Sequence, residues 1–219
     1  MEILLFGASG MVGQGALTAC VADANVTRVT AVVRRPLGIA GGKVREVVCV
    51  DLLRLAEVAG EIGRTDACLF CAGVSSVGMS EADYRRTTYD LTLAVAKVLV
   101  GISPAMRFLY VSGAGTDANG RRVWARVKGE TENALLGLGF AGVAAFRPGY
   151  IQPMDGARSK VGWINAVYAV MGPFYGLVKG VAAKFATDTR TLGRAMLKAV
   201  GPGGVNGVVE SAEINRLGR

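Results

Sequence analysis

A glycine-rich turn close to the start of the chain constrains its fold more than any other feature. The apolar residues Ile3–Phe6 lead directly into GASGMVG at positions 7–13, and apolar residues then recur at helical spacing. This order predicts a strand, a tight turn and a helix, the context in which three glycines so spaced indicate a dinucleotide site. Gly7 would permit the turn, Gly10 would let a pyrophosphate approach the backbone, and Gly13 would let the helix pack on the strand. The N–H groups at the helix N-terminus would face the phosphates. The predicted contacts in this turn are Gly7, Ser9, Gly10, Met11, Val12 and Gly13.

Strand and helix patterns alternate through the first two thirds of the chain. After the first strand we expect strands at 29–33, 44–50, 66–71, 107–111 and 142–146, and helices at 52–62, 81–100 and 122–138. Such alternation predicts an α/β fold, a Rossmann-type doubly wound parallel sheet in the order 3-2-1-4-5-6. Its ligand would lie at the carboxyl ends of the strands.

The last seventy residues lose this regularity. We expect residues 1–219 to form a single domain, in which 150–219 make a small helical cover facing a substrate or partner. Within this cover we expect a polar loop at 155–160 and a helix at 163–185, broken near Gly172-Pro173. Thr187-Asp188 is a predicted N-cap for a helix over 192–200, and 207–210 is a final short strand.

The composition indicates a well-packed protein with a basic surface. An apolar content of 51% and a mean hydropathy of +0.37 exclude a disordered chain. Glycine, proline and lysine interrupt the apolar stretch 161–185, so no transmembrane segment is predicted. No basic segment precedes the first strand, and we therefore expect no secretory signal and a cytoplasmic location. The net charge of +8 comes from scattered pairs of basic residues and not from a continuous basic stripe. We therefore expect no nucleic-acid partner. A protein partner and a homodimer are both possibilities that the sequence does not decide.

Cysteine and histidine usage narrows the possible chemistry. Two of the four cysteines, Cys68 and Cys71, lie three apart in a predicted strand. They should point to opposite faces, so we expect buried thiols and no metal site. The chain has no histidine, which excludes Ser-His-Asp hydrolysis and H-E-x-x-H zinc sites. Proton transfer would fall to tyrosine, lysine, carboxylate, cysteine or water.

Two arginines follow the second predicted strand, where an NAD site would have an acidic residue. Arg34 and Arg35 suit the 2′-phosphate of NADP(H), because guanidinium groups bind phosphate through paired hydrogen bonds. The alternative is that both are solvated loop residues. We therefore expect NADP(H) as the preferred cofactor, with NAD(H) as the second possibility. Further predicted contacts are Asp51 and Leu52 at the adenine and Ala72 and Gly73 at the adenosine ribose. Asp51 has the alternative role of capping the next helix.

Several of these motifs together resemble a known superfamily. They are the glycine turn, Asp51-Leu52, Cys71-Ala72-Gly73, Tyr110-Val111-Ser112 and Arg147-Pro148-Gly149. Residues 1 to about 150 resemble an extended or atypical short-chain dehydrogenase/reductase, most of all the small NAD(P)H-binding proteins related to the tumour-suppressor Tat-interacting protein. In that superfamily a serine after the fifth strand acts with a tyrosine and a lysine four residues apart on the next helix. The resemblance implies that Ser112 and Lys128 take the serine and lysine roles, and that Lys128 holds the nicotinamide ribose. It also implies that Pro148 lies where backbone approaches the nicotinamide.

The sequence departs from that pattern at the tyrosine. Trp124 stands four residues before Lys128, and an indole N–H donates a hydrogen bond but does not titrate usefully. Either Trp124 is a packing residue and the proton relay is absent, or Tyr150 or a water replaces the missing acid. Ser112 could equally be a turn residue, and Lys128 an ordinary exposed helix lysine.

Two functions therefore stand side by side, and the sequence leaves open whether the chain is an enzyme. The first is an NADP-dependent oxidoreductase acting on a small carbonyl or alcohol. The second is an NADPH-binding redox sensor or regulatory protein that lacks the catalytic tyrosine. An isomerase or epimerase with tightly held NAD is disfavoured by the two arginines and the missing tyrosine. The resemblance also implies a homodimer through helices 81–100 and 122–138.

Overall fold

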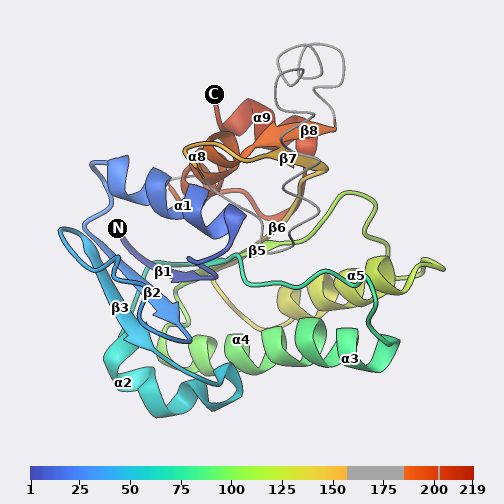
Figure 1. The fold of residues 1–219 in the computed structure, drawn as a ribbon, viewed down its shortest axis with the longest axis horizontal. Helices are drawn as coiled ribbons and strands as arrows, with labels where there is room; N and C mark the ends of the chain where they lie inside the picture. Colours follow the sequence, from blue (N-terminus) through green and yellow to red (C-terminus); the bar gives the residue numbers. More distant parts are fainter. Residues whose placement is uncertain (157–184, 202) are drawn as a thin grey trace.

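A seven-stranded parallel sheet forms the centre of the molecule (Figure 1). The computed structural model describes residues 1–156, 185–201 and 203–219. The sheet has the order β3-β2-β1-β4-β5-β6-β9, and every neighbouring pair is parallel. Its strands are β1 (Glu2–Phe6), β2 (Arg28–Val33), β3 (Val44–Val48), β4 (Ala67–Phe70), β5 (Arg107–Val111), β6 (Gly142–Arg147) and β9 (Gly207–Glu210). The predicted order 3-2-1-4-5-6 is confirmed, and the short strand expected at 207–210 adds a seventh strand beside β6.

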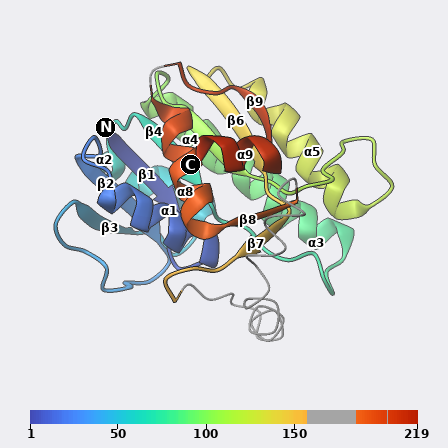
Figure 2. The same ribbon diagram turned by 90° about the horizontal axis from the view of Figure 1, so that it is seen from above.

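Helices cover both faces of this sheet. Figure 1 shows α1 (Met11–Ala22), α8 (Thr189–Val200) and α9 (Ser211–Leu217) on one face. On the other face lie the 3₁₀ segment η1 (Leu52–Val58), α2 (Ala59–Ile62), α3 (Glu81–Arg85), the π-helical segment η2 (Arg86–Asp90), α4 (Leu91–Ile102) and α5 (Val123–Leu136). Figure 2 views the molecule from the side of α1, α8 and α9. This is the doubly wound arrangement that the alternating pattern predicts.

The strands are buried on both faces because each separates two hydrophobic cores. Ile3 and Leu5 of β1 enter the core beneath α1 and α8, while Leu4 and Phe6 enter the opposite core. Cys68 likewise belongs to the second core and Cys71 packs against the first, which confirms that the two thiols point to opposite faces.

Glycines let α1 and α8 pack at very short range. A Cβ atom on Gly15 would lie 2.5 Å from the Thr189 carbonyl oxygen, and one on Gly193 would lie 2.6 Å from the Gly15 carbonyl oxygen. Asp188 caps α8 by accepting a hydrogen bond from the Thr191 N–H at 2.7 Å, which confirms the predicted N-cap. The described C-terminal residues thus complete the sheet and the α1 face.

Three features differ from the sequence expectation. The predicted helix over 81–100 is interrupted by the π-turn η2. The sequence does not show this interruption, because an extra residue in one turn leaves the apolar spacing nearly unchanged. A second, two-stranded parallel sheet joins β7 (Tyr150–Gln152) to β8 (Ala186–Asp188), and neither this sheet nor α9 was predicted. The helix expected at 163–185 lies almost entirely outside the described residues.

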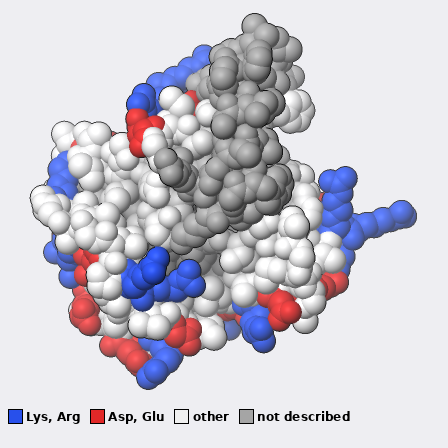
Figure 3. Space-filling model, in the orientation of Figure 1, with Lys and Arg blue, Asp and Glu red and all other residues white. Residues whose placement is uncertain are grey.

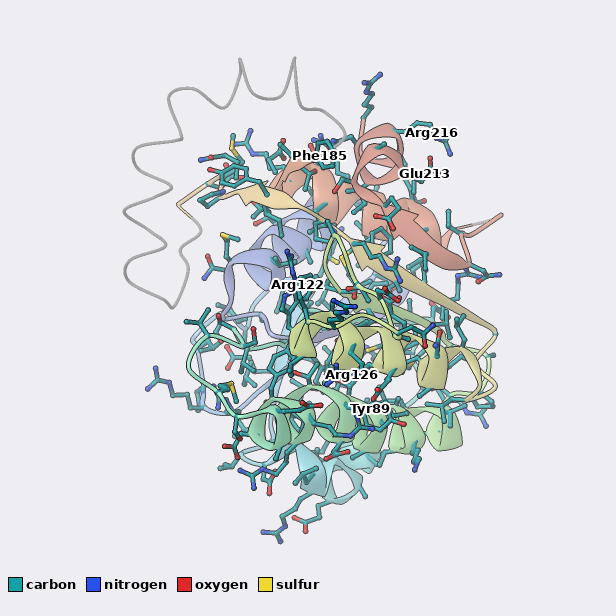
Figure 4. The ribbon with its side chains drawn as sticks, turned by 90° about the vertical axis from the view of Figure 1, so that its right-hand side faces the viewer. Tyr89, Arg122, Arg126, Phe185, Glu213 and Arg216 are labelled. Carbon is teal, nitrogen blue, oxygen red and sulfur yellow. The ribbon has the colours of Figure 1, made fainter. Side chains whose placement is uncertain are left out.

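Ion pairs hold α5 alongside the helices before it. Arg126 of α5 contacts Glu81 at 2.5 Å, and Arg85 pairs with Glu130. The Arg85 guanidinium also lies 4.5 Å from the centroid of the Tyr89 ring. Figure 4 shows Tyr89 and Arg126 on the neighbouring helices of this layer. Exposed pairs of this kind contribute little stability each, and both of them join α5 to α3.

Candidate functional site

A cavity of about 360 Å³ opens at the carboxyl ends of β1, β2 and β4. This is the edge at which doubly wound sheets bind ligands. The structure brings many of the predicted cofactor contacts together in its lining. They are Gly7, Ser9, Gly10, Arg34, Asp51, Leu52, Ala72 and Gly73.

The glycine turn has the geometry that its sequence predicts. Gly7 has φ +82°, and a Cβ atom there would lie 2.7 Å from backbone atoms of Cys71 and Ala72. A Cβ atom on Gly13 would lie 2.0 Å from the Gly7 carbonyl oxygen, so only glycine allows α1 to pack this close to the turn. Met11 and Val12, in the first turn of α1, lie beside the cavity and not in its lining.

The N-terminus of α1 is open to an anion. Gly10 is its N-cap, it supplies no capping side chain, and the first turn holds no acidic residue. A Cβ atom on Gly10 would meet only the Gly7 carbonyl oxygen, at 3.3 Å. The backbone N–H groups that begin the helix therefore have room for phosphate oxygens beside Gly10.

Basic side chains stand at the β2 end of the cavity. Arg34 lines it, and the next residue, Arg35, is exposed. Neither arginine forms an ion pair with any residue that the structure describes. On the face drawn in Figure 3, the coloured Lys and Arg side chains form separate groups and not one continuous stripe.

Asp51 caps the segment that follows it and also lines the cavity. Its carboxylate accepts a hydrogen bond from the Leu53 N–H at 3.0 Å, which makes it the N-cap of η1. The same residue lines the cavity beside Leu52. The helix-capping role is therefore observed, and contact with a ligand is compatible with it.

Ser112 and Lys128 come together at the end of β5. The Ser112 N–H donates to the Phe146 carbonyl at 2.7 Å, and its Oγ lies 3.0 Å from the Thr116 Oγ1. The Lys128 Nζ donates to the Val111 carbonyl at 3.3 Å. Burial lowers the pKa of Lys128 to about 8, and the nearby Glu132 carboxylate partly opposes that change. Lys128 is therefore not an ordinary exposed helix lysine.

The Trp124 indole lies near the turn that follows Ser112. A Cβ atom on Gly113 would lie 3.8 Å from its Cζ3, and one on Gly115 would lie 3.7 Å from its Cη2. The indole thus lies beside the glycine turn, with room for a methyl group between them. The packing role of Trp124 stays a prediction.

Pro148 and Tyr150 lie near this end of the site, outside the cavity lining. The Pro148 carbonyl accepts a hydrogen bond from the Ala114 N–H at 2.9 Å, which joins the turn 147–149 to the turn after β5. The Tyr150 hydroxyl donates to the Gln152 Oε1 at 2.6 Å, and burial raises its pKa. Tyr150 is therefore a weaker acid than an exposed tyrosine.

The cavity also includes residues that sequence reasoning missed. Thr87 and Leu91 reach it from η2 and the start of α4, and Val50 and Val74 are exposed valines in its lining. The π-turn that brings Thr87 and Leu91 to the cavity has no single-sequence signal. Val50 was predicted to end the strand over 44–50, and its exposure beyond β3 is seen only in the structure.

Within residues 1–156, 185–201 and 203–219, no group of His, Cys, Asp and Glu side chains could hold a metal ion. Within the same ranges, no helix has both the length and the apolar character needed to cross a bilayer.

The sheet order and the cavity at its carboxyl edge are those of a Rossmann-type fold, and solved structures of short-chain dehydrogenases/reductases have a similar fold. An oxidoreductase of the short-chain dehydrogenase/reductase family from Burkholderia thailandensis has a TM-score of 0.70 at 18% identity, over 97% of this chain and 92% of that chain. A dTDP-glucose 4,6-dehydratase from Streptomyces venezuelae, solved with NAD bound, has a TM-score of 0.68 at 13% identity, over 95% of this chain and 74% of that chain. At such identities the likeness shows the fold alone. No protein-family model matches the chain.

Curated relatives share the sequence more closely. The chain is 28% identical over 157 residues to "Protein fmp52, mitochondrial" of Emericella nidulans, covering 68% of this chain and 66% of that protein. It is 27% identical over 202 residues to "Protein fmp52-1, mitochondrial" of Aspergillus oryzae, covering 89% and 84%. These relatives are named mitochondrial, which contradicts the expected cytoplasmic location. That expectation rested on the absence of a basic leader before the first strand and is wrong. The finer likeness to the Tat-interacting group stays a prediction.

Proposed function

We propose that this chain binds NADP(H) and acts as an oxidoreductase on a small carbonyl or alcohol. The observation that carries the proposal is the convergence of four separate motifs on one cavity. The glycine turn, Arg34, Asp51-Leu52 and Ala72-Gly73 lie up to 66 residues apart in the sequence and line the same space. The solved dehydratase of the same fold, which has NAD bound, supports a nicotinamide cofactor.

Each part of the cavity suits one part of the dinucleotide. The pyrophosphate would lie at the Gly10 end of α1, and Arg34 and Arg35 would hold the 2′-phosphate. Leu52 would contact the adenine and Gly73 the adenosine ribose. The preference for NADP(H) over NAD(H) rests on the two arginines, whose guanidinium groups are not engaged by carboxylates of the described chain.

The reactive end would lie at Ser112 and Lys128. The cofactor supplies hydride chemistry when it is bound. Lys128 would bond the ribose hydroxyls, and the Ser112 hydroxyl would orient a carbonyl oxygen of the substrate. Trp124 cannot donate the proton, so the acid would be Tyr150 or a water.

A catalytically weak NADPH sensor is the second candidate. The Trp124 indole beside the Gly113–Gly115 turn favours it, because an indole at the position of the usual tyrosine does not supply a titrating proton donor. The two candidates differ in one measurement. Tight NADPH binding without NADPH consumption on a panel of aldehydes and ketones would support the sensor, whereas consumption would support the enzyme.

The cofactor assignment is tested by replacing Arg34 and Arg35 together with Ala. Charge-assisted hydrogen bonds contribute about 1.5–3 kcal/mol each, so the Kd for NADPH should rise at least about tenfold. The Kd for NADH should stay nearly unchanged. Both constants can be measured by titration calorimetry.

A second arginine pair offers the matched control. Arg121 and Arg122 are also adjacent and exposed, and they directly precede α5 (Figure 4 labels Arg122). Replacing both with Ala removes the same charge and should leave the preference for NADPH intact. An unchanged preference in the Arg34/Arg35 variant would contradict the 2′-phosphate assignment. Failure of the wild-type protein to bind either nucleotide would contradict the proposed function.

A further inference from the structure

Glu132 is a buried carboxylate one helical turn from Lys128. The two residues are four apart on α5, a spacing at which lysine and glutamate ordinarily lie within reach of each other. The Glu132 side chain is only 3% exposed, so its charge needs a partner. Within the described chain that partner is Arg147 and not Lys128.

Arg147 engages both oxygens of this carboxylate. Its Nε donates to the Glu132 Oε1 at 3.1 Å and its Nη2 to the Glu132 Oε2 at 2.6 Å. Its Nη1 donates to the Glu210 Oε1 of β9 at 3.2 Å. This two-pronged geometry suits a guanidinium group and not an ammonium group. Arg147 therefore ties α5, β6 and β9 together at the reactive end of the site.

The pairing of Glu132 with Arg147 leaves Lys128 without a carboxylate partner in the described chain. Its Nζ makes one hydrogen bond within the described chain, to the Val111 carbonyl, and lies 5.2 Å from the centroid of the Tyr110 ring. A lysine ammonium has three N–H groups, so this contact leaves others for a ligand. The side chain is thus held at the end of β5 without a carboxylate partner.

We propose that Arg147 is a positioning residue that occupies Glu132 and so keeps Lys128 out of an ion pair, free to bind the ligand. The inference rests on the proposed function in one respect, because the ligand is the ribose of the dinucleotide. Without Arg147, the buried Glu132 carboxylate would take Lys128 as its partner. Lys128 would then be turned along α5 and away from the ligand.

Two neighbouring groups act directly on Lys128, namely Glu132 on its own helix and the Tyr110 ring from β5. Arg147 from β6 pairs with Glu132. Loss of Arg147 leaves Glu132 uncompensated, and an opposite charge close by raises the pKa of a lysine. Loss of both Arg147 and the Glu132 charge removes that attraction.

The variant Arg147→Met tests the competition directly. In the protein without nucleotide, the pH dependence of Lys128 acetylation, followed by mass spectrometry, reports its pKa. We expect the pKa of Lys128 to rise above about 8 in Arg147→Met. The Kd for NADPH should rise about tenfold, the size of one charge-assisted hydrogen bond. In the double variant Glu132→Gln/Arg147→Met, both values should return to those of Glu132→Gln alone.

Arg147→Lys serves if Arg147→Met fails to fold. Its ammonium keeps the positive charge but cannot engage both carboxylate oxygens, so an intermediate rise in the pKa of Lys128 is expected. The inference is overturned if neither variant changes that pKa, or if Arg147→Met changes it equally in the Glu132→Gln background. A wild-type protein that binds no NADPH, while the pKa of Lys128 still responds to Arg147, would refute the proposed function and leave the competition intact.

Discussion

Replacing Lys128 with Met should stabilise the protein at neutral pH. Lys128 is half-buried on α5, and this burial lowers its pKa from 10.5 to about 8. At 1.36 kcal/mol per pH unit, a difference of about 2.5 corresponds to about 3 kcal/mol. Met fills a similar volume without a charge, so about 3 kcal/mol is the upper limit of the expected gain in unfolding free energy.

The sign of the pH dependence follows from proton binding. The unfolded chain holds a proton on Lys128 more tightly than the folded protein does, so the unfolding free energy of the wild type rises with pH between about 8 and 10.5. Met binds no proton. The advantage of Lys128→Met is therefore complete below pH 8, shrinks as the pH rises through that window, and is smallest above 10.5.

Urea denaturation followed by tryptophan fluorescence measures this difference. The unfolding free energies of wild type and Lys128→Met should be compared at pH values from neutral to 10.5. The contributions of the other titrating groups cancel in the difference between the two proteins. Lys97→Met, at an exposed position of α4, is the matched control and should change the unfolding free energy by less than about 0.5 kcal/mol. A difference between wild type and Lys128→Met that stays constant over this pH range would refute the reasoning. A confirmed gain, together with weaker NADPH binding, would mark Lys128 as a residue retained for function at a cost in stability.

Two further substitutions test the two ends of the site. Gly13→Ala places a Cβ atom 2.0 Å from the Gly7 carbonyl oxygen and should lower the unfolding free energy by about 1–3 kcal/mol and weaken NADPH binding. Thermal melts measure this loss, and Gly101→Ala, with no atom within 4 Å of the new Cβ, is the control. Equal losses of unfolding free energy in the two variants would contradict the close-packing argument. Trp124→Tyr supplies a phenol on the helix face of Lys128 and should raise NADPH-dependent turnover of aldehydes, since general acid catalysis contributes about 10²–10⁴-fold. Unchanged turnover in that variant would leave Trp124 with a packing role alone.

Local patterns were sufficient to predict the sheet and half of the candidate site. The strand over 107–111 matches β5 residue for residue, and the strand over 207–210 matches β9. Buried strands and amphipathic helices leave periodic patterns in the sequence itself, and right-handed crossovers then restrict the strand order. The glycine turn could also be predicted, because Gly13 meets the carbonyl of Gly7 six residues earlier and Gly7 has the positive φ that a tight turn requires.

Features that depend on residues far apart in the chain could not be predicted from the sequence. The π-turn η2 brings Thr87 and Leu91 to the cavity, although the apolar spacing around it is that of an ordinary helix. Asp51 had two readings in the sequence, and the hydrogen bond from the Leu53 N–H establishes the capping role. The cytoplasmic expectation was wrong for a different reason. It rested on the residues before the first strand, whereas the correction came from relatives that are named mitochondrial.

The sequence by itself determined the order of elements, the glycine turn after the first strand and the absence of histidine chemistry. Only the tertiary structure decided which charges meet. Lys128 and Glu132 are neighbours on one helix, and their spacing alone predicts an ion pair. Arg147, which β6 carries to the same place, takes that carboxylate instead. The physical reason is that the apolar periodicity and the turn residues of an element lie next to one another in the sequence, whereas the partner of a charged side chain is chosen through space among all the elements that pack around it.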